Sequence, residues 1–240
     1  MSNHLDTSKK ILVIVTNHED YPTRADKTGL WLTELTHFYD VMISAGFTVD
    51  IASPLGGKTP LDERSLGWLY MDKAAKKHLN NSRFTALLDN TLDARSISHE
   101  EYVAIYFAGG HGTMWDFKSN ADLKRLGEGI YNSGGYVTSV CHGAAALLNL
   151  QNSQQQPLIS GKQITGFSNT EEWLAGLSNE VPFFLEDEIK KLGANYDKTL
   201  LPFVSYAVAD GRIVTGQNPS SGKAVARKLL QQMSSSNSLE

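Results

Sequence analysis

The strongest constraint on the fold of this chain is the segment Ser139-Val140-Cys141-His142-Gly143, which holds its single cysteine. The residues before it, 134–140, are glycine-punctuated, β-branched and aromatic, and this predicts a buried strand. The residues after it, 143–148, are good helix formers, so a helix is expected to begin at or near His142. Small residues at Ser139 and Gly143 have the spacing of a nucleophile elbow, whose turn is too tight for larger side chains at those positions.

Such an elbow predicts a reactive cysteine. It lifts the sulfur of Cys141 above the sheet and aims it near a helix N-terminus, where unpaired N–H groups and the helix dipole favour the thiolate over the thiol. The alternative is a buried structural cysteine, which is the usual role of a lone cysteine. The coincidence of strand, small residues and helix start favours the nucleophile.

The rest of the chain has the pattern of an α/β protein with a mostly parallel sheet covered on both faces. The mixed region 58–99 predicts short helices that form an insertion or cap. Two hairpins are expected, at 158–167 and at 204–215, and the second turns on Asp210-Gly211. The other expected elements are strands at 11–15, 47–52 and 102–107, helices at 29–45, 72–79, 82–88, 120–131, 183–192 and 220–232, and a helix start at 169–172.

Length and composition predict one domain over residues 10–232, between a disordered N-terminus (1–9) and a disordered tail (233–240). The net charge of −4 and the lack of a basic stripe argue against nucleic acid or an anionic membrane as partner. One cysteine permits no internal disulfide, and the polar N-terminus does not resemble a signal peptide. No apolar run approaches the length of a membrane span. A soluble cytoplasmic protein is therefore expected.

The positions of the histidines restrict the mechanism, because none of the seven follows His142. A papain-like order, or a working class I glutamine amidotransferase, needs a histidine beyond the cysteine and is excluded. His142 is then the most economical partner for Cys141, and Glu171 or Glu172 is the candidate to orient it.

The spacing of cysteine and histidine excludes a structural zinc site, and we predict no metal. An adventitious metal site could in principle form from His18, Glu19 and His111.

Two further segments carry candidate site groups. Glu34 lies at the edge of the apolar stripe of the 29–45 helix; a buried carboxyl there would have a raised pKa and could donate a hydrogen bond to a thiolate. A solvated or salt-bridged glutamate is the alternative. The glycine-rich turn 108–112 lets backbone N–H groups approach a ligand, as in an oxyanion site, although such turns are often only tight connections. Within it, His111 either contacts substrate or is simply solvated.

These motifs together resemble the ThiJ/PfpI superfamily, in the branch of heat-shock chaperone-like glyoxalase III proteins. The resemblance implies a flavodoxin-like three-layer α/β sandwich, usually a homodimer, with no cofactor. Asp62-Glu63-Arg64-Ser65 departs from the family's frequent Asp-Pro-x-Ser, at the pocket rim. In the family's order the matching residues are Glu34, Ser53-Pro54-x-Gly56-Gly57, Ala108-Gly109-Gly110-His111-Gly112, Val140-Cys141-His142-Gly143, Thr165-Gly166-Phe167 with Glu172 beyond, and Asp210-Gly211-Arg212-x-Val214-Thr215-Gly216-Gln217-Asn218-Pro219.

The resemblance also implies roles for individual residues. Cys141 is the nucleophile, His142 its partner, Glu172 the third member, and Glu34 the buried carboxyl that touches the thiol. Backbone N–H groups of Gly110 and His142 would form the oxyanion site.

The implied activity is the conversion of a small 2-oxoaldehyde, methylglyoxal, to lactate. The thiolate would add to the aldehyde, a proton would move between the two carbons through an enediol, and water would release the hydroxy acid from a thioester. Two other functions fit the same residues: a small cysteine-dependent amidase or peptidase, and a non-enzymatic chaperone or oxidative-stress sensor whose thiol oxidises readily.

Overall fold

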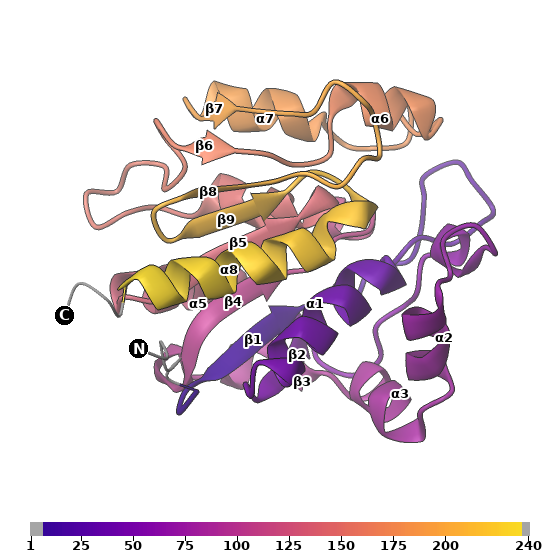
Figure 1. Ribbon diagram of the computed structural model, residues 1–240. Helices are drawn as coiled ribbons and strands as arrows, with labels where there is room; N and C mark the ends of the chain where they lie inside the picture. Colours follow the sequence, from indigo (N-terminus) through magenta and orange to yellow (C-terminus); the bar gives the residue numbers. More distant parts are fainter. Residues whose placement is uncertain (1–6, 237–240) are drawn as a thin grey trace.

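Seven strands form the central sheet, in the order β3-β2-β1-β4-β5-β9-β8 (Figure 1). The computed structural model describes residues 7–236. Neighbouring strands are parallel except β8 and β9, which form the antiparallel edge. The predicted α/β class with a mostly parallel sheet is confirmed. The strands are β1 (Lys10–Ile14), β2 (Val49–Ser53), β3 (Leu92–Asp93), β4 (Tyr102–Phe107), β5 (Tyr136–Val140), β8 (Ala207–Asp210) and β9 (Ile213–Gly216).

Helices cover both faces of this sheet and complete the three layers. Helices α1 (Leu32–Ser44) and α8 (Gly222–Ser236) pack against each other in front of the sheet as seen in Figure 1, and α5 (Ala121–Asn132) lies behind it. Strands β1, β4 and β5 supply continuous buried runs between the layers, as expected for a sheet covered on both faces.

The last helix continues beyond its predicted end at residue 232. Residues 233–236, predicted to belong to a disordered tail, are helical because this extra turn buries the side chain of Met233 against the core. Of the other residues predicted to be disordered at the ends, 7–9 are described and include a bend at 8–9, and 1–6 and 237–240 lie outside the described residues.

The predicted helical insertion lies between β2 and β3. It contains the 3₁₀ helix η1 (Glu63–Leu66) and helices α2 (Lys73–Leu79) and α3 (Ser82–Asp89), beside α1 (Figure 1). Two side-chain hydrogen bonds of 2.6 Å hold this insertion to α1. His37 of α1 contacts Asp72, the N-cap residue of α2, and Asp40 of α1 contacts His78 of α2. Short 3₁₀ helices η2 (Ala94–Ser96) and η3 (His99–Glu101) lead into β4.

The first predicted hairpin, at 158–167, is wrong. Strand β6 (Gln163–Ile164) instead pairs in parallel with β7 (Asn195–Tyr196), and the residues before it form turns. The alternation of side chains predicts a strand but does not say which strand will pair with it. Helices α6 (Asn169–Leu174) and α7 (Leu185–Lys191) lie beside this two-stranded sheet, at the top of the view in Figure 1. The second predicted hairpin is confirmed as β8–β9.

The segment after the cysteine is helical as predicted, but it winds as a 3₁₀ helix, η4 (Cys141–Asn149). Helix propensity does not separate this tighter 3₁₀ form from the α-helix, because the same residue types favour both. Within residues 7–236, no helix has the length and apolarity that crossing a bilayer requires.

Candidate active site

The nucleophile elbow forms at the junction of β5 and η4. Cys141 has a φ of +55°, in the left-handed region that residues other than glycine rarely adopt. A Cβ atom at Gly143 would lie 2.1 Å from the carbonyl oxygen of Phe107, so only glycine fits there. Ser139 is fully buried on the other side of the turn. The requirement for glycine at position 143 therefore has a direct steric cause, and the buried position of Ser139 favours a small side chain.

Cys141 lines a partly open cavity of about 270 Å³. Cys141 is 2 % exposed, and its sulfur lies 3.3 Å from Nδ1 of His142. The carboxyl of Glu34 lies beside the thiol as well. The sulfur thus has a base, a carboxyl group and an opening for a small molecule around it.

The predicted preference of Cys141 for the thiolate form is wrong for this site. Burial raises the pKa of the thiol well above its usual value, and a negative charge on Glu34 raises it further. The backbone N–H of His142 opposes this effect without outweighing it. Removal of the thiol proton therefore depends on a neighbouring base rather than on the helix N-terminus.

Glu34 is a buried carboxyl, as the sequence suggested. It projects from α1, is fully buried, and accepts a hydrogen bond of 2.8 Å from the N–H of Gly109 through Oε2. Burial raises the pKa of Glu34 well above its usual value, and the hydrogen bonds from Cys141 and Gly109 only partly oppose this. A protonated Glu34 puts no negative charge beside the sulfur and can donate a hydrogen bond to it.

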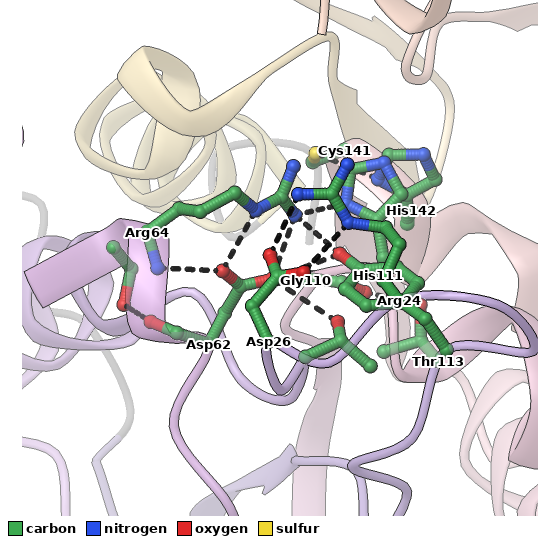
Figure 2. A network of polar contacts seen from close by, with 12 residues as sticks. Arg24, Asp26, Asp62, Arg64, Gly110, His111, Thr113, Cys141 and His142 are labelled. Atoms are coloured by element: carbon green, nitrogen blue, oxygen red, sulfur yellow. Dashed lines mark hydrogen bonds and ion pairs between the residues drawn. The ribbon is translucent and has the colours of Figure 1, made fainter. Parts of the chain in front are cut away.

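One carboxylate, Glu172, joins two histidines. Its Oε2 lies 2.8 Å from Nε2 of His142, and its Oε1 lies 2.9 Å from Nε2 of His111. Nδ1 of His111 lies 3.0 Å from Nη2 of Arg64, which can only donate, so this nitrogen accepts and Nε2 carries the ring proton. Figure 2 shows His111 and His142 close together beside Cys141. Their ring centroids are 3.8 Å apart.

The protonation states follow from these contacts. Burial, and the neighbouring His142, lower the pKa of His111 to about 4, so this ring is neutral near pH 7. Burial disfavours ionisation of Glu172, but the two histidines outweigh it and hold the pKa of Glu172 below its usual range. With its Nε2–H donated to an ionised Glu172, His142 presents Nδ1 to the sulfur as an acceptor. This is the arrangement of a general base.

Glu171, the other candidate for the third member, has a different position. Its carboxylate faces away from the histidines and is fully buried among donors from three segments of the chain. It holds the cavity wall near Phe203 and cannot orient His142. Its donors are the N–H and Oγ of Ser168, the N–H of Phe203, Nε2 of Gln217 and Nδ2 of Asn218.

One of the two predicted oxyanion groups lies at the sulfur, and the other belongs to a residue of the cavity wall. The N–H of His142 points toward the sulfur, and Gly110 lines the cavity. Gly110 has a φ of +105°, and a Cβ atom there would lie 2.1 Å from the carbonyl oxygen of Gly29. The glycine is required by this close approach, and its part in holding an oxyanion stays a prediction.

Sequence reasoning missed several groups of the cavity wall. Arg64 stands out in the sequence only as part of a departure from the family motif, and no sequence signal separates Trp31 from the other apolar residues of the predicted 29–45 helix. Phe203, with a φ of +61°, left no signal in the sequence. Aromatic and charged lining comes from Trp31, Arg64, Tyr70, Phe167 and Phe203.

The structure also changes the candidate metal ligands. Within residues 7–236, the donor atoms of His111, His142 and Glu172 lie within 4.8 Å of one another and could hold an ion. These atoms already form the hydrogen bonds described above, which a metal would have to replace. His18 does not join His111 as predicted, because its Nε2 lies 2.7 Å from the backbone oxygen of Asp20. That the protein uses no metal stays a prediction.

The profile of the DJ-1/PfpI family matches residues 27–232. This chain belongs to the DJ-1/PfpI family. The chain is 33% identical to the glutathione-independent glyoxalase HSP31 of Saccharomyces cerevisiae, over 91% of this chain and 95% of that protein. It is 30% identical to glyoxalase 3 of Candida albicans, over 92% and 97% of the two chains. The family and branch predicted from the sequence are confirmed.

Solved structures of similar proteins have the same fold. Glyoxalase III from Candida albicans superposes with a TM-score of 0.88 at 30% identity, over 94% of this chain and 98% of that chain. Rapid Encystment Protein 24 kDa of Francisella tularensis superposes with a TM-score of 0.89 at 39% identity, over 94% and 99%. The predicted flavodoxin-like sandwich is thereby confirmed across almost the whole chain.

Proposed function

We propose that this DJ-1/PfpI protein is a glutathione-independent glyoxalase that converts small 2-oxoaldehydes such as methylglyoxal to 2-hydroxy acids such as lactate. The observation that carries the proposal is the 3.3 Å contact between the Cys141 sulfur and Nδ1 of His142, with the buried Glu34 carboxyl beside the thiol and a small cavity at Cys141. Relatives named as glyoxalases, aligned over almost their full length, support it.

The first step is addition of sulfur to the aldehyde. Because burial raises the pKa of Cys141, the thiol proton passes to Nδ1 of His142 as the sulfur bonds to the aldehyde carbon C1. The electron pair of the C1=O bond moves to oxygen, where the N–H groups of Gly110 and His142 would stabilise it. Return of the proton from His142 gives the hemithioacetal.

The second step moves a proton from C1 to C2. A base removes the C1 proton, the enediol forms, and a proton is returned to C2, leaving a thioester at C1. Glu34 suits this transfer because burial raises its pKa above that of an exposed carboxyl, which makes the ionised group a stronger base. Water then hydrolyses the thioester, releasing the hydroxy acid and restoring the thiol, so the reaction consumes only water.

The shape of the cavity argues for a small substrate. At about 270 Å³, with aromatic walls, it has room for a 2-oxoaldehyde and little for a peptide backbone with its side chains. Peptidase activity is therefore disfavoured, and an amidase for small amides is the competing enzyme. The homodimer predicted from the family is likewise a proposal, which light scattering of the purified protein would test.

A chaperone role is a second candidate, supported by exposed apolar side chains on segments that also build the cavity wall. Trp68 is 83% exposed, Trp173 71% and Leu200 98%. If these side chains form one contiguous patch, it would be typical of a site that binds other proteins. Holdase activity of this kind would survive Cys141→Ala, because the sulfur itself is buried.

The deciding experiment measures lactate formed from methylglyoxal without glutathione, by wild type, Cys141→Ala, Glu34→Gln and a matched exposed control, Glu100→Gln. We expect no lactate from Cys141→Ala, a severe loss with Glu34→Gln, and wild-type activity in the control. No lactate from wild type, or full turnover by Cys141→Ala, would overturn the proposal. A mass spectrum showing an acyl adduct with a small amide would favour the amidase instead.

A further inference from the structure

Arg64 brings a positive charge into the wall of the Cys141 cavity. Its side chain is 24% exposed, and its partner Asp62 is fully buried. Asp62 binds both Nε and Nη2 of the guanidinium, at 3.1 and 2.8 Å. Nη2 also contacts Nδ1 of His111 and the hydroxyl of Tyr21. The guanidinium is therefore held in one orientation before any ligand arrives.

One side of this guanidinium remains free. Among residues 7–236, no group accepts a hydrogen bond from Nη1 of Arg64, although Nε and Nη2 are fully engaged. In Figure 2 the guanidinium lies between Asp62 and Cys141. The other cavity side chains close to it are aromatic, with the centroid of the Trp31 ring 5.8 Å from the guanidinium carbon. The free N–H groups of Nη1 are thus the charged donors that a ligand in this cavity would meet.

We propose that Nη1 of Arg64 binds the C2 oxygen of the substrate and stabilises the enediolate that forms there. This inference rests on the proposed glyoxalase function and extends it to a residue that selects substrates. The preferred substrate has an oxygen acceptor on the carbon next to the aldehyde, as 2-oxoaldehydes have and simple aldehydes lack.

Charge develops at C2 in a defined way. When the base removes the proton from C1 of the hemithioacetal, the electron pair of the C1–H bond forms the C1=C2 double bond. The π pair of the C2=O bond moves to oxygen. The negative charge on that oxygen then faces the Arg64 cation. Protonation of C2, and transfer of the C1 hydroxyl proton to the C2 oxygen, give the 2-hydroxy thioester, with no oxidant or reductant. A fixed donor whose contact strengthens as charge forms lowers the barrier.

The test compares Arg64→Gln with Arg95→Gln. Arg95 is the matched control, since it binds Asp93 two residues before it as Arg64 binds Asp62, but on the surface. We expect Arg64→Gln to lower kcat for methylglyoxal about 100-fold, the usual effect of losing one such donor. Arg95→Gln should leave kcat unchanged. A kcat of Arg64→Gln within threefold of wild type would overturn the proposal while leaving the glyoxalase function standing.

A second readout separates binding of substrate from positioning of His111. Alkylation of Cys141 by iodoacetamide needs the thiol and its base but no C2 oxygen. We expect its rate in Arg64→Gln to stay within about twofold of wild type. An equal fall in alkylation and turnover would show that Arg64 acts only through His111, against the proposal. The double variant Asp62→Asn/Arg64→Gln removes both charges and serves if the single variant does not fold.

A third arm does not depend on turnover. Acetohydroxamate carries one oxygen on each of two adjacent atoms, as the enediolate does, and its binding is measurable by calorimetry. We expect binding to wild type and to Arg95→Gln, and at least tenfold weaker binding to Arg64→Gln. Equal affinity of all three proteins would overturn the Arg64 site. If wild type makes no lactate but binds acetohydroxamate, and Arg64→Gln does not bind it, the Arg64 site stands and the proposed reaction is refuted.

Discussion

The Nε2 atom of His142 lies 2.8 Å from Oε2 of Glu172, and this contact decides which ring nitrogen faces the sulfur. Because an ionised carboxylate only accepts, Nε2 carries the proton and Nδ1 is left with a lone pair 3.3 Å from the Cys141 sulfur. A thiol with a raised pKa needs such a base at contact distance.

Glu172→Gln should abolish most activity while leaving the fold intact. The amide has one oxygen and one NH₂ group, so it accepts from one histidine and donates to the other, which forces one ring into the wrong tautomer. We expect kcat/KM for methylglyoxal to fall by about 10²–10⁴. Steady-state kinetics measures the loss, and circular dichroism reports the fold. Activity within tenfold of wild type would show that Glu172 does not orient His142.

Glu171→Gln should instead reduce stability. Its two oxygens accept five hydrogen bonds, and the NH₂ group of glutamine would face donors in place of one oxygen. A buried group left with such a mismatch costs about 1–3 kcal/mol. Urea unfolding of Glu171→Gln and Glu172→Gln, side by side, measures this difference. A Glu171→Gln protein as stable as wild type would contradict the role of Glu171 as the anchor of the cavity wall.

Glu34 should make the stability of the protein depend on pH. Burial raises the pKa of Glu34 in the folded state, whereas in the unfolded chain it titrates near about 4.3. Between these two values the folded state holds one proton more than the unfolded state, so this contribution to stability falls as the pH rises. Below about pH 4.3 both states are protonated and the contribution no longer changes.

Glu34→Gln removes this titration and supplies the measurement. From about pH 5 toward neutrality, the free energy of unfolding of the variant should rise relative to wild type by up to about 1.4 kcal/mol per pH unit. Urea unfolding at several pH values, with Glu100→Gln as exposed control, gives the difference. Parallel curves for wild type and Glu34→Gln would mean that Glu34 is already ionised in the folded protein at these pH values.

Gly143→Ala should be much more damaging than Gly211→Ala, although only Gly211 has a positive φ. A methyl group at Gly143 would lie 2.1 Å from the oxygen of Phe107, on rigid sheet backbone, whereas nothing lies within 4 Å of the corresponding position at Gly211. We expect a loss of about 3 kcal/mol or more at Gly143 and about 1–2 kcal/mol at Gly211. Thermal unfolding of both variants tests this order, and equal losses would show that the elbow yields to a larger residue.

Much of the fold could be predicted because its signals are local. The strand before Cys141, the small residues around it and the buried runs of β1 and β4 each occupy a few consecutive positions, where side-chain period and size constrain the backbone directly. The hairpin on Asp210-Gly211 has the same character, and it was predicted correctly. The hairpin at 158–167 was not, because the partner of β6 lies some thirty residues away at β7 and pairing over that distance leaves no local trace.

By itself, the sequence determined the α/β class and the elbow at Cys141. It named the adjacent His142 as the most economical partner of that cysteine, and it left open whether Glu34 is buried. Only the tertiary structure decided that Glu172 rather than Glu171 orients His142, that Arg64 enters the cavity, and that the thiol pKa is raised. The physical reason is that hydrogen-bond partners and loss of water depend on segments brought together from distant parts of the chain. The adjacent helix N-terminus alone predicts the opposite shift for the same sulfur.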